Sequence, residues 1–594
     1  MSSIVVMKFG SSVLADESQL GAVSDEIYRA LREGLRVVAV VSALGDTTDR
    51  LDSDYGDSSL SSEGYATFIG TGELRSAALL TRELGRAGIT STLADASRAR
   101  LVTDGGILNA EPVGLDTLGL IRLLELHDVV VVPGFVGRDI HGRTTLLGRG
   151  GSDLTAVFVA SRLDAPCILL KDVDGIFEQD PALSSQAVPR FEQLSWQTAL
   201  EIGGAVVQRK ALEYSAHHET SLIVRSLGGS GTLVGAFQDR LETLKGKSQK
   251  GALRVGLIGL GTVGSEVYER IRSTQELQLV AILVKDARKE RTVTSSLLTD
   301  EPATFFGTAC DLIVDCSNPS TDLNAKLLDA LKRGIKVVTA NKGNLADNLS
   351  DWAPWIKASD VGYSAAVGGV VPMLETVRKQ SANGSVQSFR AVLNGTCNFI
   401  LDRLHSGESF AEALATAQEL GFAESDPTAD IDGLDAARKC ALLAYEAWGV
   451  VVDWREIELQ GIAHLTEDDA KQAHRGGALL RLVAEGHFQD GEVSLSVKPE
   501  WVAKGSPEAL VEGPNNVLTL QATEGRVVER RGAGAGGLAT ALSVYGDLLA
   551  LTQDDDVGPG RFAANLLQVQ HDDSNVKARQ SSRGGRGSPR SLPR

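Results

Sequence analysis

Residues 254–264 read RVGLIGLGTVG, an apolar strand followed by three glycines, and the polar helical segment SEVYERIRS comes next at 265–273. In such a pattern the first glycine makes a tight turn, the second lets the backbone approach a pyrophosphate, and the third lets the helix pack closely on the strand. The N–H groups at the helix start then face the phosphate. The pattern therefore favours a Rossmann dinucleotide-binding domain over a structural turn. The predicted cofactor loop consists of Gly259, Gly261, Thr262, Val263 and Gly264.

The next strand, QLVAILV, ends in a charged turn that bears on the choice of cofactor. Lys285, Asp286, Arg288 and Lys289 follow it, and three of these four residues are basic. An acid at this strand end favours the 2′-hydroxyl of NAD, whereas basic residues favour a 2′-phosphate. The sequence therefore favours NADP through Lys285 and Arg288, and Asp286 leaves NAD open. The alternative is a charged turn that only contacts solvent.

The composition of the whole chain is that of a soluble, multidomain protein. Of the 594 residues, 43% are apolar and 23% charged, which excludes collagen-like, coiled-coil and wholly disordered chains. The net charge of −18 argues against nucleic acid and acidic membranes as partners. Five scattered cysteines without CxxC spacing indicate reduced thiols and a cytoplasmic protein. We see no signal peptide, and no apolar run approaches the roughly 18 residues of a membrane span.

Strand and helix patterns divide the chain into several segments. Apolar runs at 4–9, 36–43, 128–135, 167–173 and 220–226 alternate with amphipathic segments, which predicts a largely parallel sheet flanked by helices. We expect an α/β domain over 1–240, a polar linker over 241–252, the Rossmann domain over 253–380 and an α+β substrate domain over 381–530. A last helix over 531–555 is expected to return to the Rossmann domain, and a disordered basic tail is expected over 570–594.

Two places in the second half carry candidate catalytic side chains. Lys342 ends the segment VVTANK, and ligands of open α/β sheets bind outside the carboxyl ends of the strands. Asp435 and Lys439 are four residues apart and share one face of a predicted helix. An exposed ion pair is the alternative, but apolar neighbours such as Leu434 and Leu442 favour a buried pair with a function.

From Arg254 to about Leu551 the chain resembles the homoserine dehydrogenases. The resemblance rests on GLGTVG, DLIVDCSNPS, VVTANK, AAVGGVVPM, LNGTCNFIL, GFAESDPTADIDGLDAARK and GAGAGGLATALSV, in that order. It implies reduction of aspartate β-semialdehyde to homoserine with NAD(P)H. By position it implies that Glu424 and Asp435 hold the amino acid, that Lys439 protonates the aldehyde oxygen, that Lys342 lies beside nicotinamide and substrate, and that Gly536 lies in the cofactor site.

The chain departs from this family at one glycine turn. The family often has Glu where this chain has Ser364, and a third Gly is replaced by Val370. In some members the turn holds a monovalent cation through backbone carbonyls. The resemblance implies that Na⁺ or K⁺ would be bound here by Ser364, Val367, Gly369 and Val371.

The first half contains glycine-rich loops after strands, which expose N–H groups to phosphates. Its motifs KFGSS, VVSALGDTTDRL, GTGELRSAALL, GRGGSD and KDVDGIFEQDP together resemble the aspartate kinases of the amino-acid kinase family, over about residues 4–235. That implies an α/β/α sandwich using ATP with Mg²⁺. It further implies that phosphoryl transfer uses Lys8, Gly10 and Ser11, that Ser42, Thr48, Glu73 and Arg149 bind aspartate, and that Asp172, Phe177 and Asp180 lie near the nucleotide.

The kinase half departs further from its family. The usual KFGGTS is shortened to KFGSS, a form closer to that of glutamate 5-kinases. The family's GAKVxHP is GAVVQRK here, so Val206 replaces a nucleotide-side lysine for which the nearby Lys210 is a candidate substitute. The linker has no room for the paired regulatory modules usual in aspartate kinases, which predicts an enzyme without threonine or lysine feedback through such modules.

Three functions remain open at this stage. The first is a kinase and dehydrogenase in one chain, acting on aspartate, aspartate β-semialdehyde and homoserine and assembling as a homodimer or homotetramer. The second is a dehydrogenase whose degenerate kinase fold binds amino acids or mediates oligomerisation. The third is a dinucleotide sensor without activity, which requires Lys439 to be dispensable.

Overall fold

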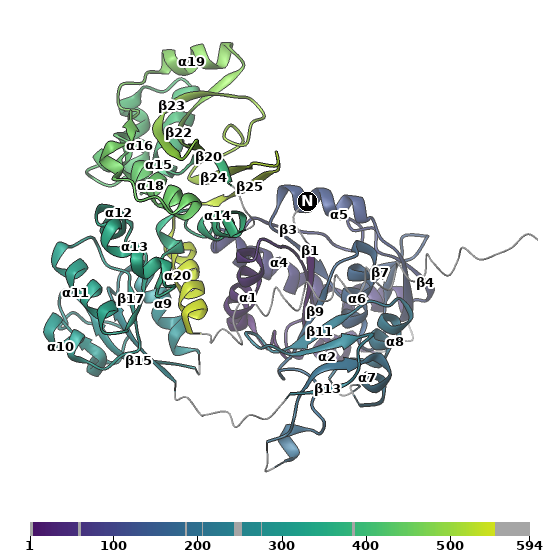
Figure 1. The fold of residues 1–594 in the computed structure, drawn as a ribbon. Helices are drawn as coiled ribbons and strands as arrows, with labels where there is room; N and C mark the ends of the chain where they lie inside the picture. The colour runs from purple at the N-terminus through teal and green to yellow at the C-terminus, as the bar shows by residue number, and fades with distance from the viewer. Residues whose placement is uncertain are drawn as a thin grey trace, which may run out of the picture. The chain divides into compact units, whose positions relative to one another are not determined.

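The computed structural model describes residues 4–56, 61–184, 187–202, 204, 206–242, 252–274, 276–382 and 386–552. The chain divides into two compact units, the first containing residues 1–85 with 90–248 and the second containing residues 86–89 with 249–553 (Figure 1). Among the described helices none has the length and apolar character that crossing a bilayer requires. The expected basic tail and nearly all of the expected linker lie outside the described residues.

A nine-stranded sheet forms the centre of the first unit. Its order is β13-β10-β12-β11-β9-β1-β2-β6-β3, and all its pairs are parallel except β11–β12 and β10–β13. Valine, isoleucine and leucine dominate the central strands because helices bury both faces of the sheet. The strands are β1 (Ile4–Phe9), β2 (Arg36–Val41), β3 (Ser91–Leu93), β6 (Val129–Pro133), β9 (Cys167–Leu170), β10 (Phe191–Ser195), β11 (Leu222–Arg225), β12 (Thr232–Gly235) and β13 (Arg240–Leu241).

The helices of the first unit follow the strands in the expected alternation. They are α1 (Leu20–Arg32), α2 (Thr47–Tyr55), α3 (Ser62–Ile69), α4 (Thr71–Arg86), α5 (Thr117–Leu126), α6 (Gly151–Leu163), α7 (Trp196–Ile202) and α8 (Arg209–His217). A second sheet, with the order β5-β4-β7-β8, was not predicted. Its strands are β4 (Val102–Gly106), β5 (Asn109–Gly114), β7 (Val136–Arg138) and β8 (Thr144–Leu146), and several are too short to give an alternating pattern.

The second unit begins with a parallel six-stranded sheet of order β16-β15-β14-β17-β18-β19. Its strands are β14 (Leu253–Ile258), β15 (Leu277–Leu283), β16 (Leu298–Thr299), β17 (Leu312–Asp315), β18 (Lys336–Thr339) and β19 (Val361–Gly362). The helices between them are α9 (Thr262–Arg272), α10 (Pro302–Gly307), α11 (Thr321–Lys332), α12 (Lys342–Asp347) and α13 (Leu349–Lys357). The last helix, α20 (Gly537–Thr552), lies beside α9, and the hydroxyls of Thr274 and Tyr545 are 2.6 Å apart (Figure 1).

An α+β region completes this unit. Its sheet has the order β21-β23-β22-β20-β24-β25 and is antiparallel except for the β21–β23 pair. The strands are β20 (Val386–Val392), β21 (Glu458–Leu459), β22 (Ala478–Gln489), β23 (Glu492–Ala503), β24 (Asn515–Ala522) and β25 (Val527–Ala533). The helices are α14 (Met373–Ala382), α15 (Gly395–His405), α16 (Phe410–Glu419), α17 (Thr428–Ile431), α18 (Leu434–Trp448) and α19 (Glu467–Arg475).

The predicted fold class is confirmed, with one local change. A parallel α/β sheet, a Rossmann sheet and an α+β region follow one another in the expected order. The strand expected to end at Lys342 ends at Thr339 instead, and Lys342 is the first residue of α12. The Asn341 side chain accepts a hydrogen bond from the Asn344 N–H and so starts this short helix.

Candidate active sites

The glycine turn after β14 has the geometry that a dinucleotide requires. Gly259 has φ +86°, and a Cβ there would lie 2.8 Å from the Cys316 carbonyl oxygen. A Cβ at Gly264 would lie 2.0 Å from the Gly259 carbonyl oxygen, so α9 packs on the turn at a distance only glycine permits. A Cβ at Gly261 would meet no atom within 4 Å, so the turn is open on that side. Each glycine therefore has the environment that its place in the fingerprint requires.

The start of α9 is available to a phosphate group. Gly261 precedes the helix and no side chain caps it. Thr262 lies against the start of α20, where a Cβ at Gly537 would come within 2.3 Å of the Thr262 methyl group. The preceding Gly536 has φ +131°, a conformation that favours glycine. The residues present therefore fit the pyrophosphate of a dinucleotide, held by the uncapped N–H groups of α9.

The basic turn after β15 is exposed. Lys285, Asp286 and Arg288 all have exposed side chains. The Arg288 Nε donates to Asp286 Oδ1 at 3.3 Å, and the same oxygen accepts the Arg288 N–H at 2.9 Å. The turn thus presents basic and acidic groups together, as the sequence suggested, and does not by its contacts favour one cofactor.

A chain of contacts leads from the glycine turn to Lys342. The Cys316 backbone packs on Gly259, and the carbonyl of the next residue, Ser317, accepts a hydrogen bond from Asn341 Nδ2 at 3.3 Å. Strands β14, β17 and β18 are parallel neighbours, so these residues all lie at the carboxyl edge of the sheet. Lys342 therefore lies at the edge where ligands of such sheets bind.

Lys342 and Lys439 bind the same buried carboxylate. The Lys342 amine pairs with Asp435 Oδ1, and the Lys439 amine lies 2.8 Å from Asp435 Oδ2. Asp435 and Lys439 are buried, whereas 43% of the Lys342 side chain is exposed. The predicted pairing of Asp435 with Lys439 along one helix is present, and Lys342 joins it from α12.

Backbone and amide groups fix the position of this cluster. The Lys439 amine also donates to the Leu393 carbonyl at 2.7 Å. Asn394 Nδ2 donates to Asp435 Oδ2 at 3.0 Å and to Asp430 Oδ1 at 2.7 Å, while its Oδ1 accepts the N–H of Cys397 and caps α15. The turn at 393–394 therefore holds both the acid and the amine of the pair.

Burial and charge act in opposite directions on these groups. Burial lowers the pKa of Lys439, and Asp435 offsets only part of that effect. Burial alone would lower the pKa of Lys342 too, but the charge of Asp435 outweighs it and raises the pKa. Burial would raise the pKa of Asp435, and the two lysines instead hold it well below its usual range. Lys439 is thus the amine that releases a proton more readily, and Lys342 stays charged.

Glu424 lies apart from these contacts. It is exposed in the loop before α17, and its backbone carbonyl accepts a hydrogen bond from Gln418 Nε2 at 3.0 Å. Its side chain is exposed to solvent, and its role toward the substrate ammonium stays a prediction.

The glycine turn expected to hold a cation is folded and buried. Gly368 and Gly369 have φ of +91° and +60°. Two of the four expected carbonyls already accept hydrogen bonds within the turn, from Val367 N–H to Ser364 and from Met373 N–H to Val371. The backbone N–H and hydroxyl of Ser364 bind the two oxygens of the buried Asp547 at 2.7 and 2.8 Å. A carboxylate from α20 thus lies beside the position where the family often has Glu, and cation binding stays a prediction.

A second lysine–aspartate cluster lies in the first unit. Asp153, near the start of α6, is buried and takes the Lys8 amine at 2.7 Å on Oδ1 and the Lys171 amine at 2.8 Å on Oδ2. Burial would raise the pKa of Asp153, but the two lysines hold it at about 2. Burial lowers the pKa of Lys8 despite Asp153. A Cβ at Gly10 would lie 2.7 Å from the Lys8 amine, so glycine makes room for it.

Three of the four predicted aspartate-binding residues lie around the end of β2. The Glu73 carboxylate accepts the Ala43 N–H at 3.4 Å through Oε1, and its buried Oε2 has no hydrogen-bond partner among the described residues. Burial raises the pKa of Glu73 to about 7. Ser42 and Thr48 are half-buried in the segment after β2, and Arg149 is exposed in the loop before α6. These observations leave their roles as predictions.

Three of the predicted nucleotide-side residues follow β9, and Ser11 follows β1. Ser11 and Asp172 are exposed, Phe177 pairs through its backbone with Arg190, and Asp180 accepts the Ala182 N–H at 2.9 Å.

The structure gives Lys210, the suggested substitute for Val206, other contacts. Its amine donates to Asn109 Oδ1 and to the carbonyls of Ala110 and Leu147 at 3.0–3.2 Å, and it pairs with Glu111 at 2.8 Å.

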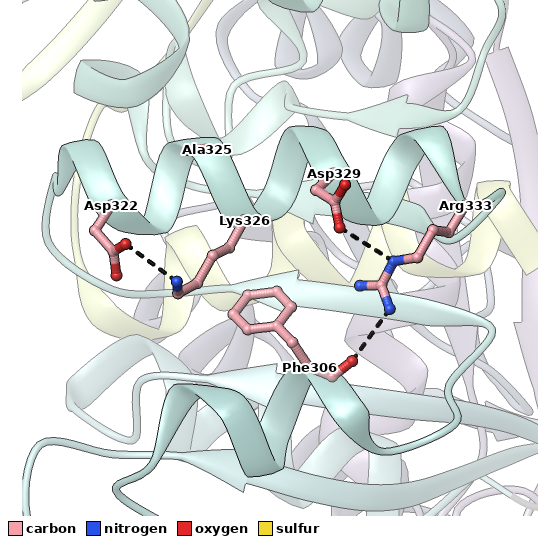
Figure 2. Close-up of a pocket in the computed structure, with 6 residues that line it drawn as sticks. All are labelled: Phe306, Asp322, Ala325, Lys326, Asp329 and Arg333. Atoms are coloured by element: carbon pink, nitrogen blue, oxygen red, sulfur yellow. Dashed lines mark hydrogen bonds and ion pairs between the residues drawn. The ribbon is translucent and has the colours of Figure 1, made fainter.

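A separate hollow of about 220 Å³ lies on α11 (Figure 2). Its charges already pair with each other, Lys326 with Asp322 at 3.1 Å and Arg333 with Asp329 at 3.4 Å. Figure 2 shows Phe306 between the two pairs, its carbonyl bound by Arg333. The hollow contains none of the predicted site residues. In the described part of the chain no three His, Cys, Asp or Glu side chains are arranged to hold a metal.

Sequence reasoning missed several members of both clusters. Asp153, Lys171, Asn394 and Asp430 lie inside motifs that were singled out, but no role was assigned to them. Their spacing gave no signal, because each meets its partner across the fold and not along one helix. Asp435 and Lys439 were found because their spacing alone brings them together.

Comparisons with known proteins find matches for both halves of the chain. The family model "Homoserine dehydrogenase" matches residues 372–549, "Homoserine dehydrogenase, NAD binding domain" matches 259–357, and "Amino acid kinase family" matches 3–226. A homoserine dehydrogenase of Bacillus subtilis is 32% identical over 322 residues, which cover 52% of this chain and 74% of that protein. One of Mycobacterium tuberculosis is 34% identical over 325 residues, covering 51% and 73%.

A solved homoserine dehydrogenase from Thiobacillus denitrificans is 29% identical, with a TM-score of 0.49 over 52% of this chain and 74% of that one. The two sequence relatives are more than 30% identical, and this chain covers more than two thirds of each. This chain belongs to the homoserine dehydrogenase family and carries, in the same polypeptide, an amino acid kinase domain.

Proposed function

We propose that the cluster of Lys342, Asp435 and Lys439 is the site at which aspartate β-semialdehyde is reduced to homoserine. The observation that carries the proposal is the buried Lys439 amine, held between Asp435 and the Leu393 carbonyl. Reduction of an aldehyde develops negative charge on its oxygen, so the site needs a positioned acid there. A bound nicotinamide supplies the hydride.

In this proposal each residue has one task. Lys439 gives its proton to the aldehyde oxygen as the carbon gains hydride, and the product is the neutral alcohol. Asp435 holds both amines in place, and Lys342 keeps its positive charge beside the substrate. Glu424 receives the substrate ammonium from the solvent side. Lys285 and Arg288, the basic residues after β15, are expected to recognise the 2′-phosphate of NADPH.

Steady-state kinetics of the full chain test this assignment. We expect oxidation of homoserine and reduction of the semialdehyde by the wild-type protein, with a lower KM for the NADP couple. A Lys439→Met variant is expected to bind the cofactor with unchanged affinity and to lose turnover. Near-normal homoserine oxidation by that variant would remove the acid–base role from Lys439.

We propose in addition that the first unit phosphorylates aspartate with ATP. The supporting observation is Glu73, a buried carboxylate with one oxygen unpartnered among the described residues, close to the end of β2. A carboxylate in such a site gains stability when an ammonium group binds it. Arg149 would then meet a substrate carboxylate, and Lys8 would meet the transferred phosphoryl group.

The kinase assay compares aspartate with glutamate, because the KFGSS turn is also close to that of glutamate 5-kinases. ADP release in the presence of Mg²⁺ is measured for the wild-type protein and Lys8→Ala. We expect release that depends on aspartate and on Lys8. A wild-type protein without amino-acid-dependent release would instead be a dehydrogenase whose kinase fold serves binding or assembly.

A further inference from the structure

Two lysines from neighbouring strands converge on Asp153 in the first unit. β1 and β9 pair in parallel with Lys8 opposite Leu169, so Lys8 and Lys171 lie at the same edge of the sheet. The Lys171 backbone N–H is fixed by the Arg225 carbonyl at 2.8 Å. Its amine reaches Asp153 Oδ2 at 2.8 Å, and only 11% of its side chain is exposed. Lys171 is therefore a positioned group and not a solvated surface lysine.

The loop in which the kinase family has its lysine passes beside the same carboxylate. The Gln208 N–H lies 3.5 Å from Asp153 Oδ2, the oxygen that Lys171 binds. Gly150 allows this approach, since a Cβ there would lie 2.4 Å from the Gln208 Cβ. Val206, two residues earlier, supplies no charge, and the Lys210 amine is bound to the β5 region. Lys171, which follows β9, thus supplies beside Asp153 the positive charge that residue 206 lacks.

The cluster carries more positive charge than its own carboxylate neutralises. Among the described residues, Asp153 is the carboxylate that pairs with the Lys8 and Lys171 amines, so two ammonium groups share one negative charge. A buried surplus of positive charge is costly unless an anion completes it. A transferring phosphoryl group is such an anion, and its charge is spread over three oxygens.

We propose that Lys171 is the second phosphate-binding lysine of the kinase half and takes the place of the lysine that Val206 lacks. This rests on the proposed kinase function. A carboxylate oxygen of the amino acid attacks the γ-phosphorus, the bond to the β–γ bridging oxygen breaks, and ADP leaves with that electron pair. Lys8 and Lys171 contact the oxygens of the moving phosphoryl group, and Asp153 keeps the two amines apart at a fixed distance.

Matched glutamine substitutions test the assignment in the full chain. Lys171→Gln and Lys210→Gln remove one charge each from the same domain, and glutamine can still donate hydrogen bonds. We expect Lys171→Gln to lower the aspartate-dependent kcat about 100-fold, the scale for loss of one transition-state donor. Lys210→Gln should stay within about threefold of wild type on the same scale. Homoserine dehydrogenase activity, unchanged in both, reports an intact second unit.

A rescue variant and a binding measurement complete the test. Adding Val206→Lys to Lys171→Gln should recover about tenfold of the lost kcat, because the 206–208 loop reaches the same carboxylate. Calorimetry should show that Lys171→Gln binds a β,γ-imido analogue of ATP about tenfold more weakly, with AMP binding unchanged, since one charge-assisted contact is lost.

The outcomes separate the two proposals. Equal affinity of wild type and Lys171→Gln for the imido analogue would overturn the role of Lys171, and so would a kcat of Lys171→Gln within about threefold of wild type. A wild-type protein that binds the analogue through Lys171 but releases no ADP with aspartate or glutamate would overturn the kinase function and leave the phosphate contact standing.

Discussion

The kinase half and the dehydrogenase half each place two lysines on one buried aspartate at the start of a helix. Gly150 precedes α6 and Gly433 precedes α18, with φ of +77° and +80°, and neither helix has a side-chain cap. Asp153 and Asp435 then occupy the first turn, where the helix dipole also favours a negative charge. The same arrangement, a glycine followed by an uncapped helix with an aspartate in its first turn, thus occurs beside two different sheets.

The two clusters differ in how their lysines are supported. In the kinase half both lysines come from the ends of neighbouring strands, and their side chains are only 8% and 11% exposed. In the dehydrogenase half Lys439 comes from the same helix as Asp435 and also binds the Leu393 carbonyl, while Lys342 is half-exposed. The first arrangement suits two fixed charges around an anion. The second suits a proton donor, Lys439, beside a lysine that stays charged, Lys342, and reduction of an aldehyde requires such an arrangement.

Removing the proton donor should have the largest effect. Lys439→Met is expected to lower kcat for reduction by about 10³-fold, within the range of general acid catalysis, and to leave kinase turnover unchanged. Methionine fills the space of the lysine stem, so the fold should persist. Lys326→Met, which breaks only the exposed pair with Asp322 on α11, is the matched control. Equal kcat values for reduction in Lys439→Met and Lys326→Met would show that Lys439 is not the proton donor. The dehydrogenase cluster would then no longer differ from the kinase cluster in this respect.

Removing the buried charge of Glu73 should affect only the kinase half. Glu73→Gln is expected to lower aspartate-dependent kcat/KM about 100-fold, because the substrate ammonium loses its carboxylate. Burial raises the pKa of Glu73 to about 7. Glu73 therefore stabilises the fold most below its unfolded pKa, and that stability is lost as pH rises through about 7.

The stability measurement for Glu73 has a defined sign. At pH 8 the wild-type carboxylate is charged and buried. The kinase half of Glu73→Gln should therefore unfold at a higher Tm than the kinase half of the wild-type protein. The difference should shrink as pH falls and vanish well below the ordinary glutamate pKa of 4.5, where the wild-type group is protonated in both the folded and the unfolded state. A Glu73→Gln variant that is less stable than wild type at pH 8 would show that the carboxylate has a partner of opposite charge.

The contrast between the halves also explains how far the sequence alone leads. The glycine turn at Gly259 and the Asp435–Lys439 pair follow from spacing, because turn geometry and helical periodicity are local. The central strands β1, β2, β6, β9 and β11 were predictable from their apolar runs. The contacts of Asp153 with Lys171 and of Asn394 with Asp435 join residues 18 and 41 positions apart. Such contacts depend on strand order and side-chain direction, which no local pattern encodes.

The pH dependence of reduction should reflect the coupling of Lys439 to Asp435. Burial lowers the pKa of Lys439 and Asp435 opposes that effect. Reduction should fall as pH rises through this pKa, because the acid loses its proton. In Asp435→Asn the opposing charge is gone, so the falling limb should move to lower pH by about one unit, equivalent to about 1.4 kcal/mol. A limb at unchanged pH would assign the titration to another group.

The smallest effect on kinetics is expected at the turn after β15. Its charges are exposed, whereas Asp153 and Asp435 of the two clusters are buried. Arg288 is exposed, and within the described part of the chain its ion pair is with Asp286, two residues away. An exposed charge contributes about 1 kcal/mol at most, so Arg288→Ser should raise KM for NADPH about fivefold and leave KM for NADH unchanged. Steady-state kinetics with both cofactors measure this, and Arg272→Ser, which removes an exposed arginine from the end of α9, is the control. An equal rise for both cofactors would mean that Arg288 supports the turn and does not recognise the 2′-phosphate.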